Sequence, residues 1–241
     1  QPEVITNYFG DGKKFGIEME YQMAAADYGT AGSVKNTEAK LKDEPFIIIS
    51  GDVLTDFDLA EAIKFHKEKK AMATMVLTRV ANPLEYGVVI TGEDGKIIRF
   101  LEKPSWGEVF SDTINTGIYI LEPEIFKYIP EKTEFDFSKN LFPLMLKEGL
   151  PLYGYIADGY WKDIGSLDEY ILAHQNVLNG DVRVQLPGER LNIVGRDVYV
   201  GKNIKMNQNK VKLKGGVVIG NNCVIEDGCE LENCVIGDDS V

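Results

Sequence analysis

From Leu191 onward, apolar residues recur every six positions, and this period constrains the fold more than any other feature of the chain. The recurring positions follow the period through one inserted and one deleted residue, and they are Val194, Val200, Met206, Leu213, Ile219, Ile225, Leu231 and Ile236. A hexapeptide period is typical of a parallel β-helix, because each six-residue side of a coil points one apolar residue inward. Residues 181–241 are therefore predicted to form such a β-helix.

Three cysteines, Cys223, Cys229 and Cys234, lie within twelve residues of this repeat. Their number is odd, and none of them forms the Cys-x-x-Cys pair of a zinc site. Free thiols in a reducing compartment are the simplest interpretation. Cys223 and Cys229 each follow an inward position by four residues. A small buried side chain fits there, so we predict a structural role for both.

An earlier apolar run, Phe46–Ile49, ends on Ser50, Gly51 and Asp52. Four consecutive apolar residues without polar alternation predict a buried parallel strand that is covered by helices on both faces. Ligands of open α/β sheets bind beyond the carboxyl ends of the strands, so Asp52 is expected where a ligand or its metal would lie. The alternative is that Asp52 only caps a turn.

A second carboxylate, Asp163, comes shortly before a predicted helix. Ser166 and Glu169 form the Ser-x-x-Glu pattern of a capping box, and Asn179-Gly180 is typical of a helix end. Asp163 is thereby predicted to lie in a loop beside the backbone donors of a helix start.

The charge balance excludes several classes of partner. The net charge of −12, from 26 basic and 38 acidic residues, leaves no basic tract for a nucleic-acid backbone or an anionic membrane surface. An anionic substrate would need locally placed cations or a metal. The sequence contains no apolar run of the roughly 18 residues that span a membrane, and no signal segment opens it. We predict a soluble, cytoplasmic protein without nucleic-acid or membrane partners.

Taken in order, six segments resemble the sugar-1-phosphate nucleotidyltransferases, and most closely the mannose-1-phosphate guanylyltransferases. They are residues 29–32, 50–56, 86–89, 102–104, 115–117 and 161–165. The resemblance implies an α/β fold with a Rossmann-like nucleotidyltransferase domain over residues 1–180, whose sheet is mixed, mostly parallel and covered by helices on both faces. A left-handed parallel β-helix of hexapeptide repeats follows over residues 181–241.

The roles of family residues carry over onto the matching positions. Asp52 and Asp163 are similar to the two carboxylates that hold Mg²⁺, a hard cation that needs few protein oxygens when substrate phosphates supply others. Lys103 resembles the lysine that grips the sugar phosphate, and Glu102 the residue that accepts hydrogen bonds from sugar hydroxyls. The resemblance also implies sugar contacts at Gly87 and Asn115, and base and ribose contacts at Gly29, Thr30 and Gly32.

The implied reaction is attack of a sugar-1-phosphate oxygen on the α-phosphorus of a nucleoside triphosphate, with release of pyrophosphate. A phosphate oxygen is already anionic, so no strong general base is required. We expect GTP and mannose-1-phosphate as substrates. Uridylyl, thymidylyl or adenylyl transfer to glucose-1-phosphate stays open, because Asp27-Tyr28 departs from the family pattern. The family's G-G-x-G-T-R-L loop does not occur in these 241 residues, so we expect the chain as it stands not to be catalytically competent.

Two other classes compete with this interpretation. An inactive fragment or a regulatory homologue would keep the fold, but a scaffold has no need of Asp52, Lys103 and Asp163 together at strand ends. An acyltransferase built on hexapeptide coils usually needs a catalytic histidine, and none follows His174. The flat sides and exposed coil ends of a β-helix also make a homo-oligomer a hypothesis.

Overall fold

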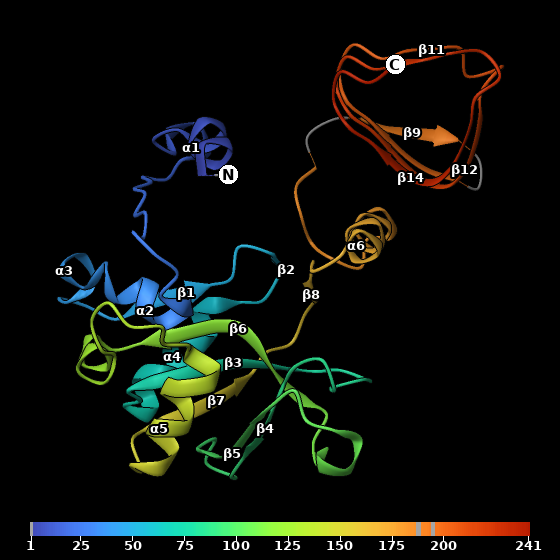
Figure 1. The fold of residues 1–241 in the computed structure, drawn as a ribbon. Coiled ribbons are helices and arrows are strands. Elements are labelled where there is room, and N and C mark those ends of the chain that lie inside the picture. The colour runs from blue at the N-terminus through green and yellow to red at the C-terminus, as the bar shows by residue number, and fades with distance from the viewer. Residues whose placement is uncertain (1, 187–188, 194–195) are drawn as a thin grey trace.

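The computed structural model describes residues 2–186, 189–193 and 196–241. Its main sheet consists of β1 (Phe46–Ile49), β3 (Ala73–Arg79), β4 (Gly87–Thr91), β5 (Ile97–Glu102), β6 (Thr113–Leu121) and β7 (Leu152–Ile156). The strand order is β5-β4-β6-β3-β7, and β1 also pairs with β6 (Figure 1). Strand β6 pairs with β4 near its start and with β1 near its end, and Gly117, with φ 77°, lies between the two pairings.

The sheet is mixed, as predicted, but it is not mostly parallel. Among the described pairs, β3·β7 is parallel, whereas β1·β6, β3·β6, β4·β5 and β4·β6 are antiparallel. Strand β1 is also less buried than predicted, since Ile47 and Ile49 are 37% and 50% exposed. An unbroken apolar run indicates neither the direction of a strand nor whether both of its faces are covered, because distant segments decide both.

Helices cover both faces of the sheet, as predicted. Met75 and Leu77 of β3 belong to one buried cluster with residues of η3 (Pro123–Tyr128), η4 (Phe137–Leu141) and α5 (Phe142–Lys147). Val76, which lies between them, belongs to another cluster with Ala62 of α4 (Leu59–Lys69). Successive side chains of a strand point to opposite faces, so β3 is buried on both. Each fully buried side chain of this kind contributes about 1.5–3 kcal/mol.

The remaining helical segments before the coils are α1 (Pro2–Phe9), η1 (Lys13–Phe15), α2 (Gly29–Lys35), α3 (Glu38–Leu41), η2 (Trp106–Glu108) and α6 (Leu167–Asn179). Helix α6 begins where the capping box predicted, because the Ser166 hydroxyl accepts a hydrogen bond from the Glu169 N–H at 3.2 Å. It ends at Gly180, with φ 83°, also as predicted. No helix among the described residues combines the length and apolar character needed to cross a membrane.

Beyond α6 the chain winds into stacked coils built from β9 (Glu189–Ile193), β10 (Arg196–Val200), β11 (Lys205–Met206), β12 (Lys212–Ile219), β13 (Val224–Ile225) and β14 (Glu230–Ile236). Parallel ladders join β10 to β12, β12 to β14 and β11 to β13. The paired residues include Val200 with Ile219, Ile219 with Ile236, Met206 with Ile225, and Leu213 with Leu231. These residues share one apolar cluster, so the hexapeptide pattern located the interior of the coils correctly. Val194 lies outside the described residues.

The cysteines and the coil corners support this packing. Cys223 is fully buried, and its thiol donates to the Gly237 carbonyl oxygen at 3.1 Å, which fits the predicted structural role. At one corner, Asn203, Asn222 and Asp239 have φ values of 60°, 58° and 60°. Their side chains form a ladder, with Asn203 Nδ2 donating to Asn222 Oδ1 at 3.0 Å and Asn222 Nδ2 to Asp239 Oδ1 at 2.9 Å. Asn and Asp are the non-glycine residues that adopt this conformation most readily.

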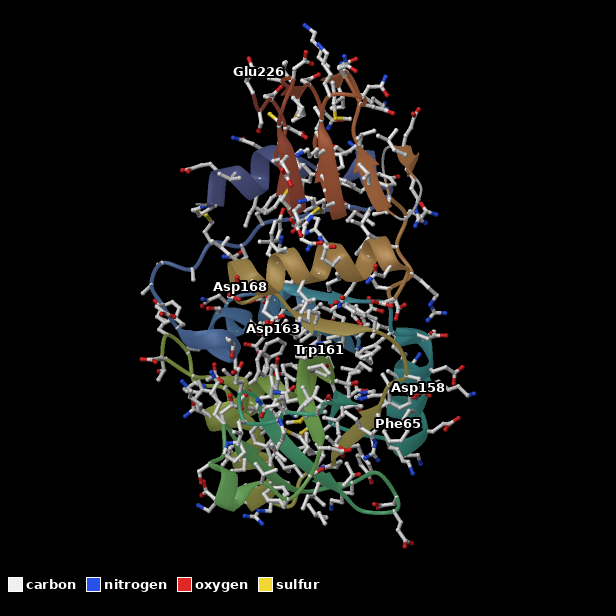
Figure 2. The ribbon with its side chains drawn as sticks, turned by 90° about the vertical axis from the view of Figure 1, so that its right-hand side faces the viewer. Phe65, Asp158, Trp161, Asp163, Asp168 and Glu226 are labelled. Carbon is white, nitrogen blue, oxygen red and sulfur yellow. The ribbon has the colours of Figure 1, made fainter. Side chains whose placement is uncertain are left out.

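Helix α6 connects the coils to the main sheet. It contacts β10, β12 and β14 on one side and β8 (Trp161–Asp163) on the other (Figure 2). Gln175 Nε2 donates to the Gly216 carbonyl oxygen of β12 at 3.0 Å, and Asn176 Nδ2 donates to the Tyr160 hydroxyl at 2.9 Å.

Candidate functional site

A two-stranded antiparallel ribbon places the two predicted metal carboxylates. Strand β2 (Val53–Thr55) pairs with β8 in a register that puts Val53 opposite Asp163. The Ile164 N–H donates to the Asp52 carbonyl oxygen at 2.9 Å, so Asp52 and Asp163 lie at the same end of the ribbon. Both carboxylates line a cleft of about 650 Å³. Figure 2 shows Trp161 and Asp163 between α6 and the main sheet.

The two carboxylates repel each other. Burial raises the pKa of Asp163 most, the charge of Asp52 raises it further, and the nearby Lys103 and Lys162 partly oppose both effects. A pair of like charges in a half-buried site favours a cation between them. The described residues contain no cluster of three or more His, Cys, Asp or Glu side chains suited to a metal. A cation bound here would therefore need further oxygen ligands from water or a substrate.

Lys103 lies at the end of β5 in a strained conformation. Its φ of 44° is in the left-handed region, and its N–H donates to the Tyr86 carbonyl oxygen at 3.1 Å. Left-handed backbone costs a non-glycine residue about 1–2 kcal/mol and persists where the surrounding structure enforces it. The Lys103 side chain lines the cleft and makes no ion pair with any described residue. Its ammonium group is thus free to meet an anion.

Glu102, next to Lys103, presents an unpaired acceptor. Its Oε2 atom is buried and has no hydrogen-bond partner among the described residues. Burial raises the pKa of this carboxyl group. Gly87 is opposite it in the β4·β5 register, and a Cβ atom at Gly87 would lie 2.7 Å from Oε2. A side chain at Gly87 would displace the Glu102 carboxylate, whose free oxygen can accept a ligand hydroxyl.

Asn115 is held at the bend of β6. Its Oδ1 accepts the Gly117 N–H at 3.1 Å, and its Nδ2 donates to the Tyr119 hydroxyl at 3.0 Å. Burial raises the pKa of Tyr119 to about 12, so the phenol stays protonated. These bonds fix the amide of Asn115 on the wall of the cleft.

The three predicted residues of the glycine loop have different environments. Thr30 lines the cleft, and its hydroxyl donates to Asp136 Oδ2 at 2.8 Å. Gly29 and Gly32 instead pack against the backbone of residues 133–135, where Cβ atoms would lie 2.8 Å from the Phe135 carbonyl oxygen and 2.6 Å from that of Thr133. The structure therefore brings Asp52, Asp163, Lys103, Glu102, Gly87, Asn115 and Thr30 to one cleft, with Gly29 and Gly32 behind its wall.

The cleft also contains residues to which the sequence assigned no role. The rings of Tyr86 and Trp161 meet edge to face with centroids 5.3 Å apart, and the Trp161 Nε1–H donates to the Thr116 carbonyl oxygen at 3.0 Å. Tyr86 and Trp161 lie inside segments that carry the family resemblance, so the sequence indicated the segments but not the roles of these two residues. Asp136 and Lys139 come from a helical turn that no motif marks, and Lys139 adds a second lysine to the lining.

Solved structures share this fold. One described as a glucose-1-phosphate thymidylyltransferase from Bacillus anthracis is 25% identical, with a TM-score of 0.65 over 76% of this chain and 74% of that one. HddC from Yersinia pseudotuberculosis is 22% identical, with a TM-score of 0.60 over 72% of this chain and 73% of that one.

Curated relatives extend the similarity along nearly the whole chain. A UTP–glucose-1-phosphate uridylyltransferase from Synechocystis sp. is 39% identical over 95% of this chain and 62% of its own length. A mannose-1-phosphate guanylyltransferase from Mycobacterium tuberculosis is 31% identical over 99% of this chain and 65% of its own length. This chain thus spans a little under two thirds of the length of these relatives. Residues 1–180 match the family described as Nucleotidyl transferase, and the chain therefore belongs to this family, among its sugar-1-phosphate nucleotidyltransferases.

Proposed function

We propose that this chain acts in nucleotidyl transfer from a nucleoside triphosphate to a sugar-1-phosphate, which yields a nucleoside diphosphate sugar and pyrophosphate. The observation that carries the proposal is the β2·β8 ribbon, which presents Asp52 and Asp163 to the cleft that Lys103 also lines. Two carboxylates and an ammonium group that forms no ion pair with a described residue suit a reaction in which phosphate charge must be neutralised and aligned.

Asp52 and Asp163 would hold Mg²⁺. The fit rests on their chemistry, because carboxylate oxygens are the ligands this cation prefers and the charge of Asp52 adds to the burial that raises the pKa of Asp163. Mg²⁺, when bound, would supply charge neutralisation at the phosphates of the triphosphate.

The other residues would bind and orient the sugar phosphate. Lys103, which lines the cleft directly after β5, would pair with its phosphate group. The buried free oxygen of Glu102 would accept a sugar hydroxyl, beside Gly87 and Asn115. A contact of Thr30 with the base and ribose of the nucleotide stays a prediction. His66 and His174 do not line the cleft, in agreement with a reaction that needs no imidazole base.

We favour GTP and mannose-1-phosphate as the substrate pair. Relatives that carry the name mannose-1-phosphate guanylyltransferase include the one from M. tuberculosis and one from rice that is 32% identical over 98% of this chain. The second candidate is UTP with glucose-1-phosphate, because the uridylyltransferase from Synechocystis has a higher identity of 39%.

The domain division remains part of the proposal. We assign residues 1–180 to the nucleotidyltransferase domain and residues 181–241 to a left-handed β-helix, whose parallel ladders are described above. Self-association through its coils, and a cytoplasmic location, stay predictions.

Calorimetric titration of the chain with GDP-mannose and with UDP-glucose, with and without Mg²⁺, would test the function. We expect Mg²⁺-dependent binding that is lost in Asp52→Asn and retained in Asp158→Asn, an exposed aspartate on the loop before β8. Tighter binding of GDP-mannose supports the first pair, and tighter binding of UDP-glucose the second. Absence of binding to both, or binding that is indifferent to Asp52, would overturn the proposal.

A further inference from the structure

Asp56 stands at the other end of the ribbon that carries Asp52 and Asp163, and its carboxylate accepts three hydrogen bonds. Only 7% of its side chain is exposed. Oδ1 accepts the Tyr160 N–H at 2.7 Å, while Oδ2 accepts the N–H of Arg183 at 3.0 Å and its Nε–H at 3.1 Å. The N–H groups of Arg183 and then of Tyr160 lower the pKa of Asp56, so this carboxylate is ionised at neutral pH.

These bonds lock the register of the ribbon. Besides the carboxylate contact, the Asp56 N–H donates to the Tyr160 carbonyl oxygen at 3.2 Å, and the Thr55 hydroxyl donates to the same oxygen at 2.8 Å. Tyr160 directly precedes β8, so its position determines which residue faces Val53. A slip of one residue would turn Asp163 to the opposite face, away from Asp52.

Arg183 links the hydrogen bonds around Asp56 to the C-terminal part of the chain. It follows the end of α6 at Gly180 and lies on the segment that leads to the coils. Its side chain is 79% exposed, and Nη2 also donates to the Asp56 carbonyl oxygen at 3.4 Å. The adjacent Val182 is 3% exposed, which anchors this segment. Asp56 thus joins three segments: the end of β2, the start of β8 and the entry to the coils.

We propose that Asp56 is a positioning residue that sets the spacing of Asp52 and Asp163 through the β2·β8 register, and that Arg183 couples this spacing to the C-terminal coils. The proposal rests on the proposed function for the role of the two carboxylates. Without the Arg183 side chain, the ribbon keeps its strand pairing and the direct bonds between Asp56 and Tyr160, but Asp56 loses the Nε–H and Nη2–H bonds that orient it, so the metal end becomes less ordered. The alternative is that the Asp56 contacts stabilise only their own end of the ribbon and do not affect the end that carries Asp52 and Asp163.

Amide hydrogen exchange distinguishes the two without any ligand. In Arg183→Ala, we expect faster exchange at Tyr160 and also at Ile164. The Ile164 N–H donates to the Asp52 carbonyl oxygen at the end of the ribbon that carries the two candidate metal ligands. The expected increase at Ile164 is about threefold, which corresponds to about 0.65 kcal/mol and lies within what a solvent-exposed ion pair contributes, since the Arg183 side chain is 79% exposed and its backbone N–H bond remains. Asp56→Asn should increase the exchange rate of the Ile164 amide more than Arg183→Ala does. Faster exchange at Tyr160 alone would overturn the proposal.

Binding of Mn²⁺ alone, followed by electron paramagnetic resonance, tests the consequence for the carboxylates. We expect Arg183→Ala to weaken Mn²⁺ binding about threefold and Arg183→Lys, which keeps the charge, to weaken it less. Arg79→Ala is the matched control, because Arg79 forms an exposed ion pair with Asp112 at 2.7 Å and does not line the cleft. Unchanged Mn²⁺ affinity in Arg183→Ala would overturn the proposal. If the unmodified chain binds no Mn²⁺, the failure belongs to the proposed metal site, and exchange at Ile164 still decides the positioning role.

Discussion

Ile164 donates its backbone N–H to the carbonyl oxygen of Asp52 across 2.9 Å, and this bond closes the ribbon end that carries both candidate metal ligands. The two carboxylates are therefore held near each other by main-chain contacts. Groups held against their own repulsion cost stability, and such sites are where function and stability oppose each other.

The first prediction concerns this cost. Burial and the charge of Asp52 raise the pKa of Asp163 in the folded chain, so the folded state binds its proton more tightly than the unfolded state does. The stability contribution of this group is then lost as pH rises through the raised pKa, and at pH 7 the ionised Asp163 carboxylate is destabilising. We expect Asp163→Asn to have a higher Tm than the unmodified chain at pH 7 in the absence of divalent cations.

Adding millimolar Mg²⁺ should reverse the order of the two Tm values, because a ligand that binds only the folded state stabilises it. The Tm of the unmodified chain should rise and that of Asp163→Asn should not. Asp158→Asn, on the preceding loop, should behave like the unmodified chain in both conditions. A lower Tm of Asp163→Asn without cations would show that the carboxylate stabilises the ribbon instead of straining it.

The second prediction separates the backbone of Lys103 from its charge. Glycine relieves a φ of 44°, whereas alanine does not, so we expect Lys103→Gly to have an unfolding free energy about 1 kcal/mol higher than Lys103→Ala. Both should lose affinity for a sugar-1-phosphate. Lys132, with φ 51° outside the cleft lining, is the control: Lys132→Gly should gain stability with unchanged affinity. Urea unfolding and calorimetry measure the two effects, and equal stability of the two Lys103 variants would refute the strain argument.

The local patterns of the sequence were reliable where short-range contacts decide the structure. The six-residue period identified Val200, Ile219 and Ile236 as stacked interior residues, because each coil depends only on its neighbours. The capping box set the start of α6 at Ser166 for the same reason. The predictions for the direction of β1 and the burial of Ile49 were wrong, since both depend on segments distant in the sequence, such as β6 about seventy positions later.

The same distinction applies to the cleft. Asp52, Lys103 and Asp163 stand in short motifs at strand ends and were found there. Asp136 and Lys139 reach the cleft because Phe137 packs against Tyr119, with ring centroids 5.2 Å apart, and this brings a helical turn over β6. No spacing in the sequence marks a contact that tertiary packing creates, so these residues could not be predicted.

The third prediction tests the contact between Gly87 and Glu102. In Gly87→Ala, the new Cβ would lie 2.7 Å from both Glu102 Oε2 and Phe100 Cε2, so the carboxylate must move. We expect roughly tenfold weaker binding of a sugar-1-phosphate, as when one hydrogen bond to a charged group is lost, and unchanged binding of inorganic phosphate. Gly237→Ala, where a Cβ meets no atom within 4 Å, is the control. Equal losses for sugar phosphate and phosphate would place the effect at Lys103 instead.

The last prediction uses His66, a buried histidine outside the cleft. It is 1% exposed, with Nδ1 2.8 Å from Thr74 Oγ1 and Nε2 3.2 Å from Glu122 Oε1. Burial lowers its pKa, and Glu122 opposes this only in part. The folded state therefore binds the proton less readily than the unfolded chain, whose histidine titrates near pH 6.5. It follows that His66 reduces the unfolding free energy as the pH falls below about 6.5.

Buried carboxyl groups such as Glu102 act in the opposite direction, because their raised pKa values favour the folded state in acid. The test is therefore the difference between variants in urea unfolding at pH 7.5 and pH 5.5. His66→Gln should be less stable at pH 7.5, by about 1–3 kcal/mol for the disrupted buried contacts, but should lose less stability on acidification than the unmodified chain. His174→Gln should keep the full acid-dependent loss. Parallel stability curves for His66→Gln and the unmodified chain would mean that His66 takes up a proton in the folded state as easily as in the unfolded one.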